Sequence, residues 1–246
     1  MPFLTDDGRP LDELLLAQRP ADGHRFELRR PFHYLDPVSG RAYEVPVHVA
    51  RAGEAVSPSD SDLASVPSWL WGLIASYGRQ SAPALLHDSR SVIAAGLGDR
   101  RAALAQRRFD DRVFRTALRE QGVPLVRAWL MWAWISADRE REFGGAAGLV
   151  FVAQAVLGGL VVLGASVAAF WNPLWLVLLV VVVLAALVWG RLGGAMLVLS
   201  FSIAWLGPFV AVQLLAIVPF RLVEALVELV TGGDPVGVLR PTARSR

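Results

Sequence analysis

The stretch FGGAAGLVFVAQAVLGGLVVLGASVAAFWNPLWLVLLVVVVLAALVWG, residues 143–190, decides the fold of this chain. It carries no charged side chain, and after Arg191 a second uncharged stretch continues to residue 220. An apolar helix of about 20 residues is long enough to cross the hydrocarbon core of a lipid bilayer. Residues 143–220 are therefore expected to form membrane-embedded helices, and a lipid bilayer is the first expected partner.

Turn residues divide the first uncharged stretch into two helices. Residues 147–170 are long enough for one full span, and Asn172 and Pro173 then predict a tight turn. Residues 174–189 are shorter but consist almost entirely of Leu, Val and Ala. Together the two segments predict a helical hairpin.

Small residues recur four apart on the first of these helices. Ala155 has this spacing to Gly159, and Gly164 has it to Ala168. Small side chains at a helix interface let two backbones approach closely in a membrane. The pattern therefore predicts close packing within the hairpin, with a simple tolerance of small residues as the equal alternative.

The second uncharged stretch leaves the number of spans open. Residues 192–218 are long enough for a third span, but Gly207 and Pro208 interrupt them. Arginines prefer the cytoplasmic side of a membrane, so Arg191 and the arginines just before residue 143 place the N-terminal part in the cytoplasm. Three complete spans would leave the arginines of the tail outside. Two spans with a kinked or re-entrant third segment, and three ordinary spans, are both retained.

Charged residues return after residue 220. Arg221, Glu224 and Glu228 lie on one side of a helix over residues 220–230, which is typical of an amphipathic helix in the membrane interface. We expect residues 221–246 to form this helix and a disordered tail.

The first 142 residues have a different composition. Arg and the acidic residues occur there in equal numbers, and all four histidines of the chain lie there. Nucleic-acid binding needs a basic face, so no nucleic-acid partner is expected. The chain has no cysteine, which excludes disulfides, thiolate catalysis and Cys-ligated zinc. Any chemistry is expected from residues 1–142, and the sequence identifies no protein partner.

Alternating residues predict a β-hairpin near the start of this domain. Residues 24–34 and 41–50 flank a turn-forming stretch, residues 36–40. On the second arm Tyr43 and Val45 alternate with polar residues, as in a half-buried strand. Pro46 in this arm favours an edge position in the sheet.

Helical patterns dominate after residue 80. We expect helices over residues 81–95, 100–121 and 125–138. The second has many arginines interleaved with acids, which predicts a solvated face with ion pairs, or contact with anionic lipid headgroups. The third carries three tryptophans that either pack the core of the domain or anchor the helix at the headgroups: Trp129, Trp132 and Trp134.

Six short motifs stand out in this domain. They are YEVP at 43–46, SDLASVP at 61–67, YGR at 77–79, ALLHD at 84–88, DRVF at 111–114 and GVP at 122–124. In residues, order and spacing, the set resembles the phage-associated domain-of-unknown-function family 1353. The resemblance covers about residues 25–134 and implies an architecture without a settled activity. Members of that family usually have a Tyr shortly after the His-Asp pair, whereas here Ser89, Arg90 and Ser91 follow.

His87 and Asp88 are the starting point for any catalytic hypothesis. Adjacent helical residues point about 100° apart, so the pair is not a hydrogen-bonded dyad by itself. Asp111 on the next helix could orient one imidazole nitrogen while the other activates a water, which makes His87 and Asp111 the candidate catalytic residues. Asp88 and Asp62 would then offer oxygens to a hard cation such as Ca²⁺. The arrangement is similar to secreted and viral phospholipases A2, which implies a lipid substrate.

Two other interpretations stay open. A His-Asp phosphohydrolase site would add His33 or His48 as an upstream metal ligand, although Asp111 follows Asp88 more closely than that fold usually allows. In the non-enzymatic interpretation, His87 and Asp88 hold the helices together through buried hydrogen bonds to the loop of Asp62.

The sequence therefore predicts three regions. Residues 1–142 form an α+β domain with a small N-terminal β-hairpin and helices, residues 143–220 form two or three transmembrane helices, and residues 221–246 form the interfacial helix and tail. We expect an integral membrane protein whose soluble domain is cytoplasmic. The two functional hypotheses are a metal-assisted hydrolase acting near the membrane, with a divalent cation as its cofactor, and a non-enzymatic membrane-tethered interaction or structural module.

Overall fold

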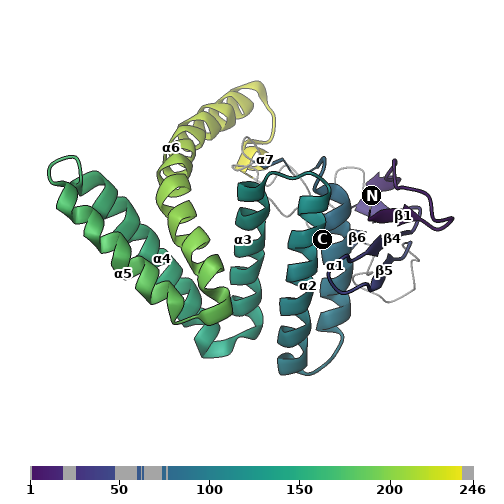
Figure 1. The fold of residues 1–246 in the computed structure, drawn as a ribbon. Helices are drawn as coiled ribbons and strands as arrows, with labels where there is room; N and C mark the ends of the chain where they lie inside the picture. Colours follow the sequence, from purple (N-terminus) through teal and green to yellow (C-terminus); the bar gives the residue numbers. More distant parts are fainter. Residues whose placement is uncertain are drawn as a thin grey trace.

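The computed structural model describes residues 2–18, 26–47, 60–61, 63, 74–75 and 77–239. Two small antiparallel sheets lie at one end of a row of long helices (Figure 1). The domain is α+β, as predicted. The described part of the chain also contains the long apolar helices that follow it.

The first sheet contains the predicted hairpin. Its strand order is β1-β4-β5, made of Phe3–Thr5, Phe32–Leu35 and Ala42–Val45. Tyr34 lies opposite Tyr43 in the hairpin register. Asp36 closes the turn, because its carboxylate accepts hydrogen bonds from the backbone N–H groups of Val38 and Ser39. Strand β1 was not predicted, because its three residues are too few to display an alternating pattern.

The second sheet has the order β2-β3-β6, made of Leu16–Gln18, Phe26–Leu28 and Asp60–Ser61. The predicted first arm, residues 24–34, is thus divided between two sheets. The division falls at residues 29–31, where Pro31 has no N–H to donate to a ladder. Residues 24–25 and 48–50 of the two predicted arms lie outside the described residues.

Three polar or amphipathic helices follow, close to the predicted bounds. They are α1 (Ser81–Ala95), α2 (Arg100–Glu120) and α3 (Leu125–Phe143). Asp99 begins α2, because its side chain accepts hydrogen bonds from the backbone N–H groups of Arg101 and Ala102. α3 continues past the predicted end at residue 138, so it joins the charged segment to the apolar helices directly.

The core of the domain lies between the sheets and the first two helices. Phe3, Phe32 and Tyr34 pack there against Leu85 and Leu86 of α1, and all five side chains are buried. This contact fixes the face of α1 that points to the sheets. Of the candidate pair that follows Leu86, His87 is turned toward α2 and Asp88 toward Ser61 of β6.

The apolar helices begin directly after α3. They are α4 (Gly145–Ala168), η2 (Pro173–Val177), α5 (Leu178–Leu187), η3 (Gly190–Leu192), α6 (Gly193–Thr231) and α7 (Pro235–Leu239). α4 and α5 lie side by side as a hairpin (Figure 1). At its tip the Asn172 side chain accepts a hydrogen bond from the backbone N–H of Leu174. Two helices, Gly145–Ala168 and Gly190–Thr231, are long and apolar enough to cross a membrane by length and composition.

α6 is a single helix that runs through Pro208 and Pro219. It curves away from the other helices in its second half (Figure 1), as helices do where a proline removes a backbone hydrogen bond. Residues 220–230, expected to form a separate interfacial helix, belong to the last turns of α6, which ends at Thr231.

The small residues of α4 make their closest approach to α6. A Cβ atom on Gly159 would lie 2.6 Å from Cγ2 of Ile203, and one on Gly158 would clash with the Ser200 hydroxyl. Gly164, in contrast, faces open space. A helix does approach closely at Gly159, as predicted, but this helix is α6 and not the expected partner α5.

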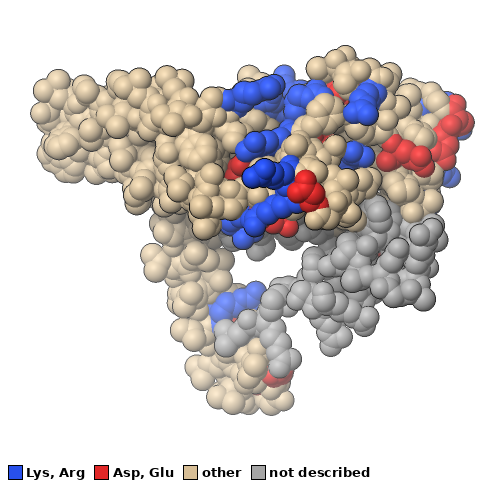
Figure 2. All heavy atoms as spheres, turned by 90° about the horizontal axis from the view of Figure 1, so that it is seen from below, with Lys and Arg blue, Asp and Glu red and all other residues tan. Residues whose placement is uncertain are grey.

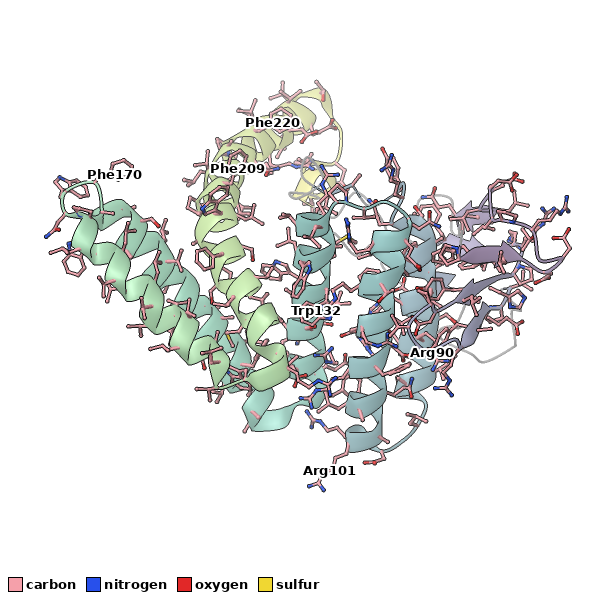
Figure 3. All side chains as sticks on the ribbon, in the orientation of Figure 1. Arg90, Arg101, Trp132, Phe170, Phe209 and Phe220 are labelled. Atoms are coloured by element: carbon pink, nitrogen blue, oxygen red, sulfur yellow. The ribbon has the colours of Figure 1, made fainter. Side chains whose placement is uncertain are left out.

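α3 is shared between the domain and the apolar helices. Trp132 is buried in a cluster with Phe151 of α4 and with Met196 and Leu199 of α6 (Figure 3). Trp129 packs against the same cluster. These two tryptophans pack against the apolar helices rather than in the core of the domain, which neither interpretation foresaw. α3 and α4 follow one another directly, with only Gly144 between them.

Candidate functional site

The candidate residues meet between α1, α2 and α3. His87 and Asp88 lie on α1, and Asp111 lies on α2. The His87 Nε2 atom is 3.1 Å from Asp111 Oδ1, and Nδ1 is 3.5 Å from Asp88 Oδ1. The predicted contact between His87 and Asp111 is present. The Asp88 contact is at the limit of a hydrogen bond, as expected for adjacent residues that point apart.

The environment of the imidazole is mostly buried. The His87 side chain keeps 11% of its surface exposed, and its ring lies 5.0 Å from the ring of Phe114. Burial alone would lower the pKa of His87, but the hydrogen bonds and negative charges of Asp111 and Asp88 outweigh it and raise the pKa to about 9. At neutral pH both ring nitrogens therefore carry protons and face carboxylates.

Asp111 has a second cationic partner. Its Oδ2 atom accepts a hydrogen bond from the Arg139 guanidinium of α3, and neither side chain exposes more than 1% of its surface. Arg139 also donates to Glu140 Oε1, at 3.1 Å from Nε. Arg108 of α2 holds the same carboxylate with two hydrogen bonds, of 2.9 and 2.8 Å. A paired guanidinium and carboxylate of this kind is strong and directional.

These contacts form one continuous line of alternating charges, which we call the ionic chain: Asp88, His87, Asp111, Arg139, Glu140 and Arg108. With His87 protonated, its three negative charges face three positive charges. Alternation matters because an unpaired buried charge is costly. The ionic chain ties α1, α2 and α3 together just before the polypeptide enters α4.

The loop after β6 is attached to the other end of the ionic chain. The Ser61 hydroxyl donates to Asp88 Oδ2 and accepts the backbone N–H of Leu63 at 2.8 Å. Leu63 is buried and has a positive φ of 64°, which is rare for a residue with a Cβ. These contacts over Asp88 give a physical reason for Ser61 and Leu63 in the motif at 61–67.

The structure brings together three of the four predicted site residues. His87, Asp88 and Asp111 are neighbours, and Asp62 lies outside the described residues. Within the described ranges, no group of three or more His, Asp or Glu side chains could hold a metal ion. The oxygens of Asp88 and Asp111 nearest His87 lie at opposite nitrogens of its ring, and both carboxylates have other protein partners.

The upstream histidines do not extend the site in the part of the chain that the structure describes. His33 Nε2 contacts Asp6 Oδ1 at 3.0 Å at the sheet, on strand β4. His48 and His24 are outside the described residues.

Sequence reasoning missed Arg139, Glu140 and Arg108 as members of this site. From the sequence, Arg139 was interpreted only as one of the arginines that orient the chain in a membrane. Arg108 was interpreted as part of a solvated helix face. A signal was present, since Arg139 continues the buried stripe of α3 through Ala128, Trp132 and Ser136 at spacings of three and four residues. A charged residue on such a stripe indicates a buried partner.

The comparisons with known proteins bear on this domain. Residues 27–135 match the family described as "Protein of unknown function (DUF1353)", so this segment carries that domain of unknown function. The match includes His87, Asp88 and Asp111 and ends before Arg139 and the apolar helices. It does not indicate an association with phages. No curated protein and no solved structure matches the chain.

Proposed function

We propose that the chain is an integral membrane protein whose N-terminal domain is a non-enzymatic interaction or structural module, held rigidly on its membrane helices by α3. The observation that carries this proposal is the ionic chain, in which both ring nitrogens of His87 face carboxylates. A general base must be able to take up a proton near the working pH. An imidazole whose pKa is raised to about 9 already holds that proton, and its role is to pin α1 to α2.

The surface of the apolar helices supports a bilayer location. Large side chains are exposed on every apolar helix, for example Leu157 and Leu160 on α4, Leu184 on α5 and Phe209 on α6. An exposed apolar surface of this extent is unfavourable in water, at about 25 cal/mol per Å². At the hairpin tip, Phe170 and Trp171 are largely exposed, which suits the aromatic belt of a membrane interface (Figure 3).

The packing of α3 supports rigid attachment. Trp132 is buried against α4 and α6, and the Arg115 guanidinium of α2 lies 4.4 Å from the ring centres of both Trp129 and Trp132. A motion of the apolar helices would therefore be transmitted to α2, and from there to the ionic chain. Such a coupling suits a module that presents a partner-binding surface at a fixed position on the membrane.

A metal-assisted hydrolase is the second candidate, favoured by the predicted contact between His87 and Asp111. For this activity His87 would have to release a proton that two carboxylates hold in place. Asp111 would also have to act while bound to Arg139. Both requirements make this function the weaker proposal.

The location is tested by alkaline extraction and by cysteine labelling of the full chain, which contains no native cysteine. We expect the protein to stay with the membranes in alkaline carbonate and to leave them in detergent. Asn172→Cys at the hairpin tip should react with an impermeant maleimide in intact cells, and Val38→Cys in the exposed β-turn only after lysis. Release by carbonate would refute the membrane location, and the reverse labelling pattern would refute the orientation.

The choice between module and hydrolase is tested on the purified full chain with calcium and with phospholipid and phosphoester substrates. The module proposal expects no turnover above that of a His87→Gln variant. Turnover that His87→Gln abolishes, at an unchanged melting temperature, would establish the hydrolase instead.

A further inference from the structure

Two arginines beside the ionic chain have no acidic partner. The ionic chain is balanced by itself, since Asp88, Asp111 and Glu140 are matched by cations already named. Arg100 and Arg107, both on α2, form no ion pair with any side chain in the described part of the chain. Neither guanidinium therefore has a described carboxylate within ion-pair distance.

Arg107 is the more unusual of the two. It is 7% exposed, its Nε atom is buried without a hydrogen-bond partner, and its guanidinium lies 5.7 Å from the centre of the Phe143 ring. A buried cationic donor without a partner is costly. The site is therefore one in which an added acceptor would be stabilising.

Arg100 lies at the same place. Seven residues separate the two arginines on α2, so they lie on nearly the same face of the helix. Arg100 donates to the backbone oxygens of Phe143 at 3.0 Å and of Glu142 at 2.7 Å. Phe143 thus contacts both guanidinium groups, that of Arg100 through its backbone oxygen and that of Arg107 through its ring. It is the last residue of α3 before the apolar α4.

The surrounding surface is basic. Figure 2 shows a band of basic side chains on this end of the molecule, directly beside the apolar helices. Arg101 is exposed there and points outward at the end of α2 (Figure 3), and Arg141 is exposed in an ion pair with Asp138. A basic surface next to a membrane helix attracts the anionic phosphates of lipid headgroups, and a guanidinium binds a phosphate through a planar pair of donors.

We propose that Arg100 and Arg107, at the junction of α2, α3 and α4, form a binding site for the phosphate of an anionic phospholipid headgroup. The site is distinct from the ionic chain and uses none of its residues. It rests on the proposed membrane location, which the carbonate extraction tests separately. Arg107 supplies the buried donor, Arg100 a second charge, and Phe143 an apolar contact for the lipid next to α4.

The test uses the full chain in neutral detergent micelles. The melting temperature is followed during titration with short-chain phosphatidylglycerol, short-chain phosphatidylcholine or inorganic phosphate, since a ligand that binds the folded state raises it in proportion to occupancy. We expect a saturable rise with phosphatidylglycerol and little effect of the other two. Arg107→Gln and Arg100→Gln should each weaken the apparent affinity by at least about tenfold, as expected for one charge-assisted contact.

Arg127→Gln is the matched control, because Arg127 is an exposed arginine near the opposite end of α3. It should leave the titration unchanged. An equal loss in all three variants would show unspecific charge attraction and overturn the site, and so would titrations that neither site variant alters. Phosphate as effective as phosphatidylglycerol would overturn the lipid as its ligand. If Arg107→Gln does not fold, Arg100→Gln and Arg107→Lys decide: Arg100→Gln should lose binding and Arg107→Lys should retain part of it.

Discussion

Arg139 and Asp111 form an ion pair between α3 and α2 in which neither side chain exposes more than 1% of its surface. Breaking a buried pair by removing one partner leaves the other charge uncompensated. We expect Arg139→Gln to reduce the free energy of unfolding by about 3–5 kcal/mol, measured on the full chain in detergent. Arg141→Gln is the control, since its pair with Asp138 is exposed on both sides and should contribute less than about 1 kcal/mol. Equal effects of the two variants would contradict the buried role of Arg139.

The raised pKa of His87 predicts how stability depends on pH. The ordinary pKa is 6.5 and the folded value is about 9, so the folded state binds the proton more tightly than the unfolded state. This contribution is complete below about pH 6.5 and is lost as the pH rises through about 9, and it is on the order of 3 kcal/mol. His87→Gln should flatten the stability profile over this range. An unchanged slope in that variant would assign the pH dependence to another group.

The hydrogen bonds of the Ser61 hydroxyl should hold Ser61 and Leu63 against Asp88. Ser61→Ala removes the hydroxyl that bonds both the Asp88 carboxylate and the Leu63 backbone. We expect a loss of about 1–3 kcal/mol, because a half-buried acceptor and a buried backbone donor lose their partner. Ser91 lies on α1, the helix that carries Asp88. Ser91→Ala removes only a hydrogen bond to the His87 carbonyl and should therefore cost less. Chemical denaturation of both variants measures the difference.

The close contact between α4 and α6 predicts opposite outcomes at two glycines of one helix. Gly159→Leu should separate the helices, because even a Cβ would lie 2.6 Å from Ile203 and 3.1 Å from the backbone oxygen of Ser200. We expect a loss of about 1–3 kcal/mol or more. Gly164→Leu has open space around it and should be tolerated. Thermal unfolding in micelles separates the two, and a tolerated Gly159→Leu would mean that the helices do not meet there.

The tryptophans of α3 should differ in the same way. Trp132 is 8% exposed and packs against α4 and α6, whereas Trp134 is 40% exposed. Trp132→Ala should cost about 3–5 kcal/mol, as expected for a large buried side chain. Trp134→Ala should cost clearly less. A larger loss at Trp134 would indicate that this tryptophan, and not Trp132, anchors the helix.

Much of the secondary structure followed from local patterns. The bounds of α1 and α2 were predicted within one residue, because periodic apolar residues, the cap at Asp99 and the stop at Gly122 and Pro124 act locally. The hairpin of β4 and β5 followed from its alternating residues. Strand β1 did not, because three residues carry too little pattern and depend on pairing with β4, far along the chain.

Only part of the candidate site could be predicted from the sequence, because the other residues depend on contacts between distant segments. His87, Asp88 and Asp111 could be chosen from the sequence because they belong to recognisable motifs, and the contact between His87 and Asp111 follows from two neighbouring helices. The role of Arg107 could not be predicted, since an arginine in a charged helix is usually solvated. Arg139 could have been suspected from its place on the buried stripe of α3, but its partner Asp111 could not. Their burial depends on how α3 packs against α2.

By itself, the sequence determined most of the helical segments, the change from charged to apolar helices and the chemically distinctive residues, but not the continuity of α6 through Pro208 or the short helix α7. These properties depend on side-chain type and on periodicity over a few turns. The tertiary structure decided the partners: that Gly159 meets α6, that Trp132 joins the domain to the apolar helices, and that His87 lies between two carboxylates. Partners are set by the packing of surfaces that are distant in sequence, and the charge state and role of His87 follow from those partners alone.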